Sequence, residues 1–201
     1  EPTVASEGQQ VRESLGDAAR AEVSIGFGVG TLRIDSISEG SDLISGKIEL
    51  HRGEKLEREF DISGGTAQLR LQSSGSFVPL LGWQGNKIWS LGLNRDVPMD
   101  LEIDVGVGDA SIDLGRMNLT ALRVGSGVGR TVVTMPREGT LSASVDGGVG
   151  EVIVQIPESM EVRLEVETGL GSVSVPPTYR RNGDVYTSVG YAEQGEDHLD
   201  L

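Results

Sequence analysis

Four consecutive segments decide the fold: MDLEIDVGVGDASIDLGRMNL (99–119), TALRVGSGVGRTVVTMPREGT (120–140), LSASVDGGVGEVIVQIPESME (141–161) and VRLEVETGLGSVSVPP (162–177). Each segment has two glycines around one apolar residue. The second glycine falls at 108, 129, 150 and 171, so the repeat length is 21 residues throughout. A fixed period in this range is typical of solenoids and other repeat arrays.

Apolar residues lie two apart on both sides of the glycines, with mostly polar residues between them. The columns before the glycines are Met99, Thr120, Leu141 and Val162, then Leu101, Leu122, Ala143 and Leu164, then Ile103, Val124, Val145 and Val166. A period of two predicts half-buried strands. The sequence therefore predicts an all-β solenoid of stacked, roughly 21-residue, two-strand rungs with Gly-x-Gly turns.

The rest of the chain is predicted to extend and close this array. Residues 1–9 are predicted to be a flexible tether and 10–201 a single solenoid domain. Within it, 10–36 form a first rung around Gly28-Val29-Gly30, 37–98 an irregular insertion or cap, 99–177 the regular repeats and 178–201 a partial rung. In the insertion, strands are expected at 46–51, 56–62 and 67–72, with a glycine turn at 63–65.

The last four residues, His198-Leu-Asp-Leu201, match the opening of a rung such as Asp100-Leu-Glu-Ile103, but no glycine turn follows. Either the natural chain continues past Leu201, or this half-rung pairs with another segment. An unpaired edge strand here would be a contact for an oligomer.

Composition excludes several classes of function. The chain has 31 acidic and 17 basic residues, a net charge of −14, 29 glycines and no cysteine. Acidity of this size argues against nucleic-acid binding and against electrostatic attachment to anionic lipid. No apolar run approaches the ~20 residues that cross a bilayer. The polar start at Glu1, without a Met, suggests that a targeting or membrane segment precedes this chain.

Little in the sequence points to chemistry. His51 and His198 are expected to be surface residues, so a catalytic triad is not predicted. The Gly-x-Gly pairs precede strands rather than helices, which argues against a phosphate cradle. Two interpretations remain for the carboxylates near the turns, solvated side chains or a row that binds calcium: Asp104, Asp109, Asp113, Asp146, Glu151 and Glu167. We predict no catalytic residue, cofactor or metal ligand.

Two sets of apolar residues are candidates for a partner surface. The residues between the glycines, Val107, Val128, Val149 and Leu170 (with Val29 in the first rung), either plug the end of the core or form an exposed ridge. Trp83 and Trp89 either pack in the cap or form a platform for a partner or a glycan.

The run from Trp89 to Leu114, WSLGLNRDVPMDLEIDVGVGDASIDL, and the opening Val23-Ser-Ile-Gly-Phe-Gly-Val-Gly resemble the toast-rack family. This family contains bacterial envelope proteins related to the C-terminal domain of LiaF-like proteins, and similar glycines occur in adhesin-like β-solenoids. The resemblance covers roughly residues 10–201. It implies an extracytoplasmic or membrane-associated domain without known catalysis, and many relatives look like lipoproteins.

The predicted function is therefore a non-enzymatic interaction domain of the bacterial cell envelope, acting as a regulator in envelope-stress signalling. The resemblance implies an envelope or membrane protein as partner, such as a sensor kinase, and membrane contact only through a segment absent from this chain. The alternative is a surface adhesin or glycan-binding module.

Overall fold

The computed structural model describes residues 8–37, 40–51, 53–75, 87–165, 174–189, 191 and 198–201. All regular secondary structure in these residues is β, which confirms the predicted fold class. The strands are β1 (Gln9–Ser14), β2 (Arg20–Ile37), β3 (Asp42–Ile48), β4 (Lys55–Ser63), β5 (Thr66–Ser74), β6 (Ile88–Asn94), β7 (Met99–Asp113), β8 (Leu119–Thr134), β9 (Leu141–Gln155), β10 (Glu161–Glu165), β11 (Arg180–Asn182), β12 (Val185–Thr187) and β13 (His198–Asp200). In this part of the chain we find no helix able to cross a membrane.

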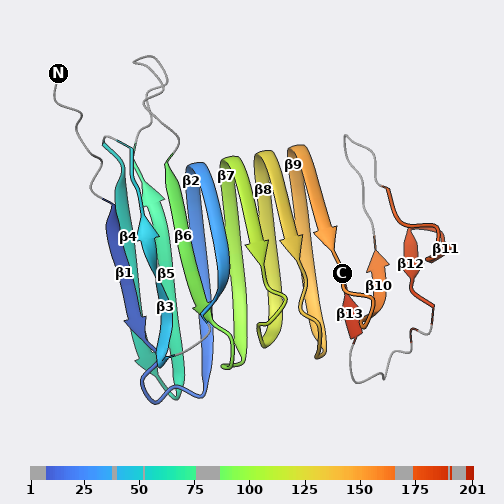
Figure 1. Cartoon of the computed structure of the whole chain (residues 1–201), viewed down its shortest axis with the longest axis horizontal. Coiled ribbons are helices and arrows are strands. Elements are labelled where there is room, and N and C mark those ends of the chain that lie inside the picture. Colours follow the sequence, from blue (N-terminus) through green and yellow to red (C-terminus); the bar gives the residue numbers. More distant parts are fainter. Residues whose placement is uncertain are drawn as a thin grey trace.

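β2, β7, β8 and β9 are the rungs of the solenoid. Each is one long strand that rises on one side, turns over at its Gly-x-Gly and returns on the other side (Figure 1). We call the residues before the glycines the first arm and those after them the second arm. Neighbouring rungs pair in parallel and in register on both arms. The pairing runs past the corner, from Phe27–Val105 to Val29–Val107, so each predicted pair of strands is one bent strand.

The two glycines of each corner are required by geometry. The φ angles of Gly108, Gly129 and Gly150 are 133°, 135° and 139°, a region that L side chains rarely adopt. A Cβ on Gly129 would also collide with the carbonyl oxygen of Gly108, and one on Gly127 with that of Gly106. The corners therefore stack in direct backbone contact.

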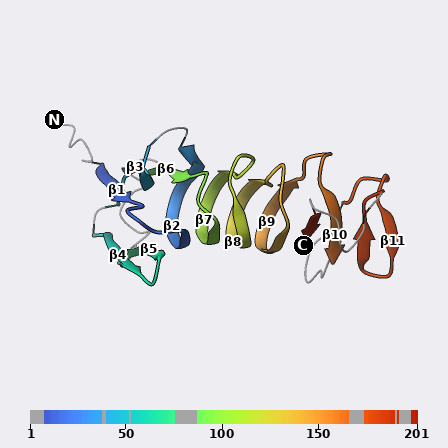
Figure 2. The same cartoon turned by 90° about the horizontal axis from the view of Figure 1, so that it is seen from below.

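The two arms of each rung form two layers (Figure 2). Buried side chains from both arms form one largely aliphatic core. The predicted columns are confirmed at Leu101 and Leu122, each 3% exposed, and at Ile103 and Val124, both fully buried.

One predicted column was wrong by a residue. A β-bulge pairs Met99 with Leu119, and the next pair is Asp100–Ala121. Leu119 is buried, while Thr120 is exposed and donates its hydroxyl hydrogen to Asp100. One extra residue in a strand turns the neighbouring side chain to the opposite face, so Thr120 does not line the core.

The insertion builds an irregular N-terminal cap. β5 pairs with the first arm of β2 and β6 with its second arm, so these two strands together replace one rung. β4 then adds antiparallel to β5, and β3 and β1 add antiparallel beyond β6. Gly64 and Gly65, with φ of 59° and 79°, form the turn between β4 and β5, which confirms the glycine turn predicted there.

The C-terminal half-rung pairs within the chain. β13 lies between β9 and β10 and is parallel to both, and the β11–β12 hairpin lies on the far side of β10 (Figure 1). The sequence left open whether residues 198–201 pair with another segment. In the structure they do, and Leu199 is fully buried.

Gly129→Ala is expected to lower the free energy of unfolding by about 3 kcal/mol or more, because backbone strain and the collision with Gly108 add together. Gly139→Ala is the matched control. Gly139 also has a positive φ, 98°, but a Cβ added there would meet nothing within 4 Å. It should therefore lose only about 1–2 kcal/mol from strain. Urea denaturation followed by circular dichroism measures both, and equal losses would contradict close stacking of the corners.

The bulge makes a second prediction. Leu119→Ala should cost about 2–4 kcal/mol, because it removes a buried side chain. Thr120→Ala should cost less than about 1 kcal/mol, since Thr120 is exposed. The same denaturation experiment compares the two variants, and the reverse order would show that Thr120 lines the core.

Candidate functional site

The valines between the corner glycines lie at the edge where the two arms meet. Val107, Val128 and Val149 pair with one another across successive rungs, and their exposed fractions rise from 41% to 48% and 72%. Val29, in the first rung, is half-buried at the start of the same row. We call Val107, Val128 and Val149 the valine ridge. Of the two sequence-based interpretations, the exposed ridge describes these three residues better than a core plug.

Leu170, the fourth candidate of this row, and Trp83 lie outside the described residues. Trp89 does not reach the surface, because its side chain is 1% exposed. Its ring meets Phe27 edge to face, with the ring centroids 5.5 Å apart and the planes at 79°. The structure therefore corrects the hypothesis that Trp89 belongs to a partner platform and places it in the core of the cap.

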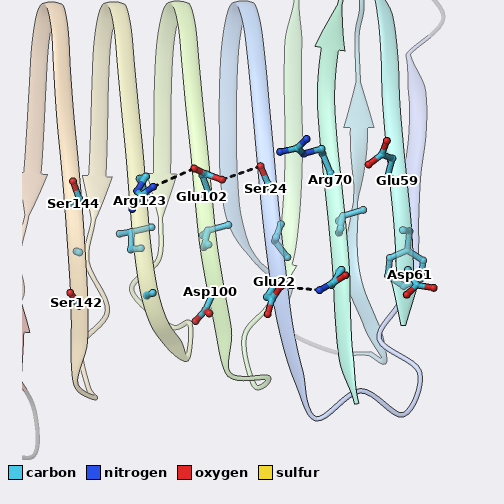
Figure 3. Close-up of a pocket in the computed structure, with 18 residues that line it drawn as sticks. Glu22, Ser24, Glu59, Asp61, Arg70, Asp100, Glu102, Arg123, Ser142 and Ser144 are labelled. Atoms are coloured by element: carbon cyan, nitrogen blue, oxygen red, sulfur yellow. Dashed lines mark hydrogen bonds and ion pairs between the residues drawn. The ribbon is translucent and has the colours of Figure 1, made fainter. Parts of the chain in front are cut away.

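A second feature is a shallow trough of about 820 Å³ on the outer face of the first arms. The β4–β5 hairpin lies out of line with the rungs (Figure 2). Its residues Glu59, Phe60 and Asp61 line one side of the trough. Its polar lining consists of Glu22, Ser24, Glu59, Asp61, Gln68, Arg70, Asp100, Glu102, Arg123, Ser142 and Ser144 (Figure 3). Acidic side chains outnumber the two arginines, so the trough favours a ligand with hydrogen-bond donors or positive charge.

Side chains in the trough are linked across the rungs (Figure 3). Ser24 Oγ donates to Glu102 Oε2 at 3.4 Å, and Arg123 Nη1 lies 3.9 Å from Glu102 Oε1. On the other side Gln68 Nε2 donates to Glu22 Oε2 at 3.1 Å. These are exposed or part-buried contacts, so each contributes little to stability and can be exchanged for contacts to a ligand.

Sequence reasoning missed the trough for a physical reason. Its polar residues are the outward-facing members of the same alternation that predicted the core, so the sequence does predict that they face outward. The concavity comes from a hairpin inserted far from the regular repeats, and no local pattern in the sequence encodes that placement.

The carboxylates near the turns do not form a uniform row. Asp109, Arg130 and Glu151 occupy equivalent positions on successive rungs, and Arg130 Nε lies 2.8 Å from Glu151 Oε2. Charges of alternating sign neutralise one another instead of attracting a cation. Asp104, Gly125 and Asp146 occupy another set of equivalent positions on the same three rungs, so a glycine without a side chain separates these two carboxylates.

Other predicted candidates have local roles. Asp113 Oδ1 accepts a hydrogen bond from Gly115 N at 3.0 Å, in the turn after β7. Glu167 lies outside the described residues. Across the described ranges no group of three or more His, Asp or Glu side chains is arranged to hold a metal ion. His51 Nε2 lies 3.3 Å from the carbonyl oxygen of Val29, beside the first corner.

Comparisons with known proteins agree with this architecture. Residues 2–155 match the family model described as the N-terminal domain of toast_rack, DUF2154. A crystal structure from Clostridium sporogenes ATCC 15579, provisionally described as that of a cell adhesion protein, is similar at a TM-score of 0.80 and 21% identity, over 96% of this chain and 93% of that chain. At this identity the likeness shows the fold alone.

A second crystal structure, from Parabacteroides distasonis ATCC 8503 and provisionally described as that of an adhesin, covers 75% of this chain and 66% of that chain at 14% identity. Its TM-score of 0.26 is too low to support a comparison of folds. No curated protein sequence matches the chain.

The alternating row makes a testable prediction. Both side chains of the Arg130–Glu151 pair are about 60% exposed, so Glu151→Gln should change the free energy of unfolding by at most about 1 kcal/mol. The change should largely disappear in 1 M salt, which screens exposed pairs. Denaturation at low and high salt measures it, and a larger loss that persists in salt would contradict the assignment as an exposed ion pair.

Proposed function

Since the chain belongs to the toast-rack family, we propose that it is a non-enzymatic interaction domain of the bacterial cell envelope, which binds a protein partner through its valine ridge. The observation that carries this proposal is the repeated exposure of one apolar residue type at one position of successive rungs. Neighbouring strands in a sheet are about 4.8 Å apart, so the ridge presents a straight row of apolar contacts at that spacing.

The glycines beside each valine favour close approach of a partner. They carry no side chains, so the corner offers methyl groups and bare backbone to a partner without protruding groups next to them. Three valines are far fewer than the 20–30 residues a side of a standard interface. The ridge therefore acts as the apolar centre of a larger contact, with polar residues of both arms around it.

A regulatory role in envelope-stress signalling is the form of this function that the resemblance to LiaF-like proteins supports. The partner would then be a membrane protein such as a sensor kinase, and the domain would work on the extracytoplasmic side. The acidic surface, with a net charge of −14, fits this choice because it favours a protein partner over an anionic lipid surface.

A surface adhesin is the second candidate, and the trough favours it. Its floor crosses several rungs and carries carboxylates, serines and arginines, which are the kinds of groups that hydrogen-bond to hydroxyl-rich ligands. The description of the Clostridium sporogenes protein supports the same idea. Trp89 would not take part in glycan stacking, because it is buried.

The test compares capture of envelope proteins by the immobilised domain and by Val128→Asp/Val149→Asp. Two charges at exposed apolar positions should weaken binding of a ridge partner at least tenfold, because each must be desolvated on contact. Quantitative mass spectrometry of a detergent-solubilised envelope extract identifies the retained proteins. Titration with each purified protein then gives the dissociation constants.

The control is Ser90→Asp/Ser111→Asp, which adds the same charge at two exposed serines that lie outside both the corner and the trough. It should bind like the unchanged domain. A partner that both double variants retain equally would place the binding surface elsewhere. Saturable binding of an oligosaccharide that Arg70→Ala and Glu102→Ala abolish would favour the adhesin.

A further inference from the structure

The C-terminal strand β13 occupies an unexpected place in the sheet. β9 and β10 are consecutive in the chain, yet they do not pair with each other in the described residues, because β13 lies between them (Figure 1). Leu199 and Asp200 pair with Leu141 and Ser142 on one side. On the other side, His198 to Asp200 pair with Glu161 to Arg163.

The register across β13 is the register of directly stacked rungs. Leu199 pairs with both Leu141 and Val162, and these two residues are 21 positions apart, which is the repeat length of the array. β10 is therefore displaced from β9 by one strand spacing without any shift along the strand. If β13 were removed, β10 could pair with β9 by moving sideways alone.

The connection between β9 and β10 also has the length of an ordinary rung connection. Residues 156–160 join these strands, compared with 114–118 between β7 and β8 and 135–140 between β8 and β9. The connection before β10 is therefore no longer than those between rungs that pair directly, although β13 separates β10 from β9. On its far side β10 carries β12 and β11, which can move with it without losing their pairings.

The contacts of β13 are more extensive with β10 than with β9. Leu201 N donates to Arg163 O at 2.9 Å, and Glu165 N donates to Leu201 O at 2.6 Å. Towards β9 the pairing covers two residues, Leu199 and Asp200. Leu199 is fully buried, so it anchors β13 in the position between β9 and β10, which we call the slot.

We propose that residues 198–201 form a removable strand and that the chain has two arrangements. In the wedged arrangement β13 separates β9 from β10. In the closed arrangement β10 pairs directly with β9, Val162 faces Leu141, and residues 198–201 are released as a free strand with two leucines. This proposal does not depend on the valine ridge, because the slot lies on the first arms, away from the corner.

Disulfide trapping distinguishes the two arrangements, and the chain has no cysteine of its own. Ser142 is adjacent to Asp200, about 4.8 Å away between neighbouring strands, so Ser142→Cys/Asp200→Cys should form a bridge in the wedged arrangement. Ser142 and Arg163 are two strand spacings apart, about 9.6 Å, which is beyond the reach of a disulfide. Ser142→Cys/Arg163→Cys should therefore form an intramolecular bridge only in the closed arrangement.

Both pairs are oxidised as monomers of the 201-residue chain, and bridge formation is followed by non-reducing electrophoresis and mass spectrometry. We expect Ser142→Cys/Arg163→Cys to form its bridge slowly, and at least tenfold faster when Leu199→Asp is added, because a buried carboxylate expels β13 from the slot. If Leu199→Asp prevents folding, the test rests on Ser142→Cys/Arg163→Cys with Leu199 unchanged, and on whether this pair forms its bridge at all. Failure of this pair to bridge in every folded background, while Ser142→Cys/Asp200→Cys bridges readily, would overturn the proposal.

Discussion

The backbone contact between stacked corners is the constraint on which the rest of the structure depends. At each corner a glycine Cα lies so close to the carbonyl oxygen of the previous rung that no side chain fits between them. This contact fixes where each rung begins its return and therefore which residues of the two arms face inward. It also holds across the insertion, because Gly30 and Gly108 pair in register although 78 residues separate them in the chain. Contact between corners, rather than continuity of the chain, sets the register of the array.

A stack of parallel rungs has two open ends, and the chain closes them differently. At the N-terminal end the pairing changes from parallel to antiparallel. One of the two edge strands there, β4, carries a charge at Lys55, Glu57, Arg58, Glu59 and Asp61. Charged residues on an edge strand oppose pairing with another sheet. At the other end the described strands become short, and one of them, β13, comes from the end of the chain. The first end is protected by the charges on an edge strand, and the second by an outermost described strand, β11, that is only three residues long and carries Arg180 and Arg181.

Much of the fold could be predicted from the sequence because each rung repeats the same local rules. The alternation of apolar and polar residues predicted the buried columns that include Leu101 and Ile103. The 21-residue spacing of the glycines predicted the positions of the corners. Prediction failed where an interaction is not local. The bulge at Thr120 arises from pairing between rungs, and burial of Trp89 depends on Phe27, which is far away in the sequence. The trough and the position of β13 also depend on segments that come together only in the folded chain, so periodicity could not reveal them.

Positions where packing within the repeat does not dictate the residue type are the most informative about function. Next to the ridge, the outward position changes from Asp109 to Arg130 to Glu151, as expected where solvent accepts any polar side chain. At the ridge itself valine is kept in each described rung, although its exposure rises to 72% at Val149. Val29 is half-buried, so burial gives a reason for a valine there. The hydrophobic gain scales with the area removed from water, so this reason becomes weaker from Val107 to Val149 as their exposure rises. This repeated apolar residue, kept where packing requires it less and less, is the observation on which the proposed partner surface rests.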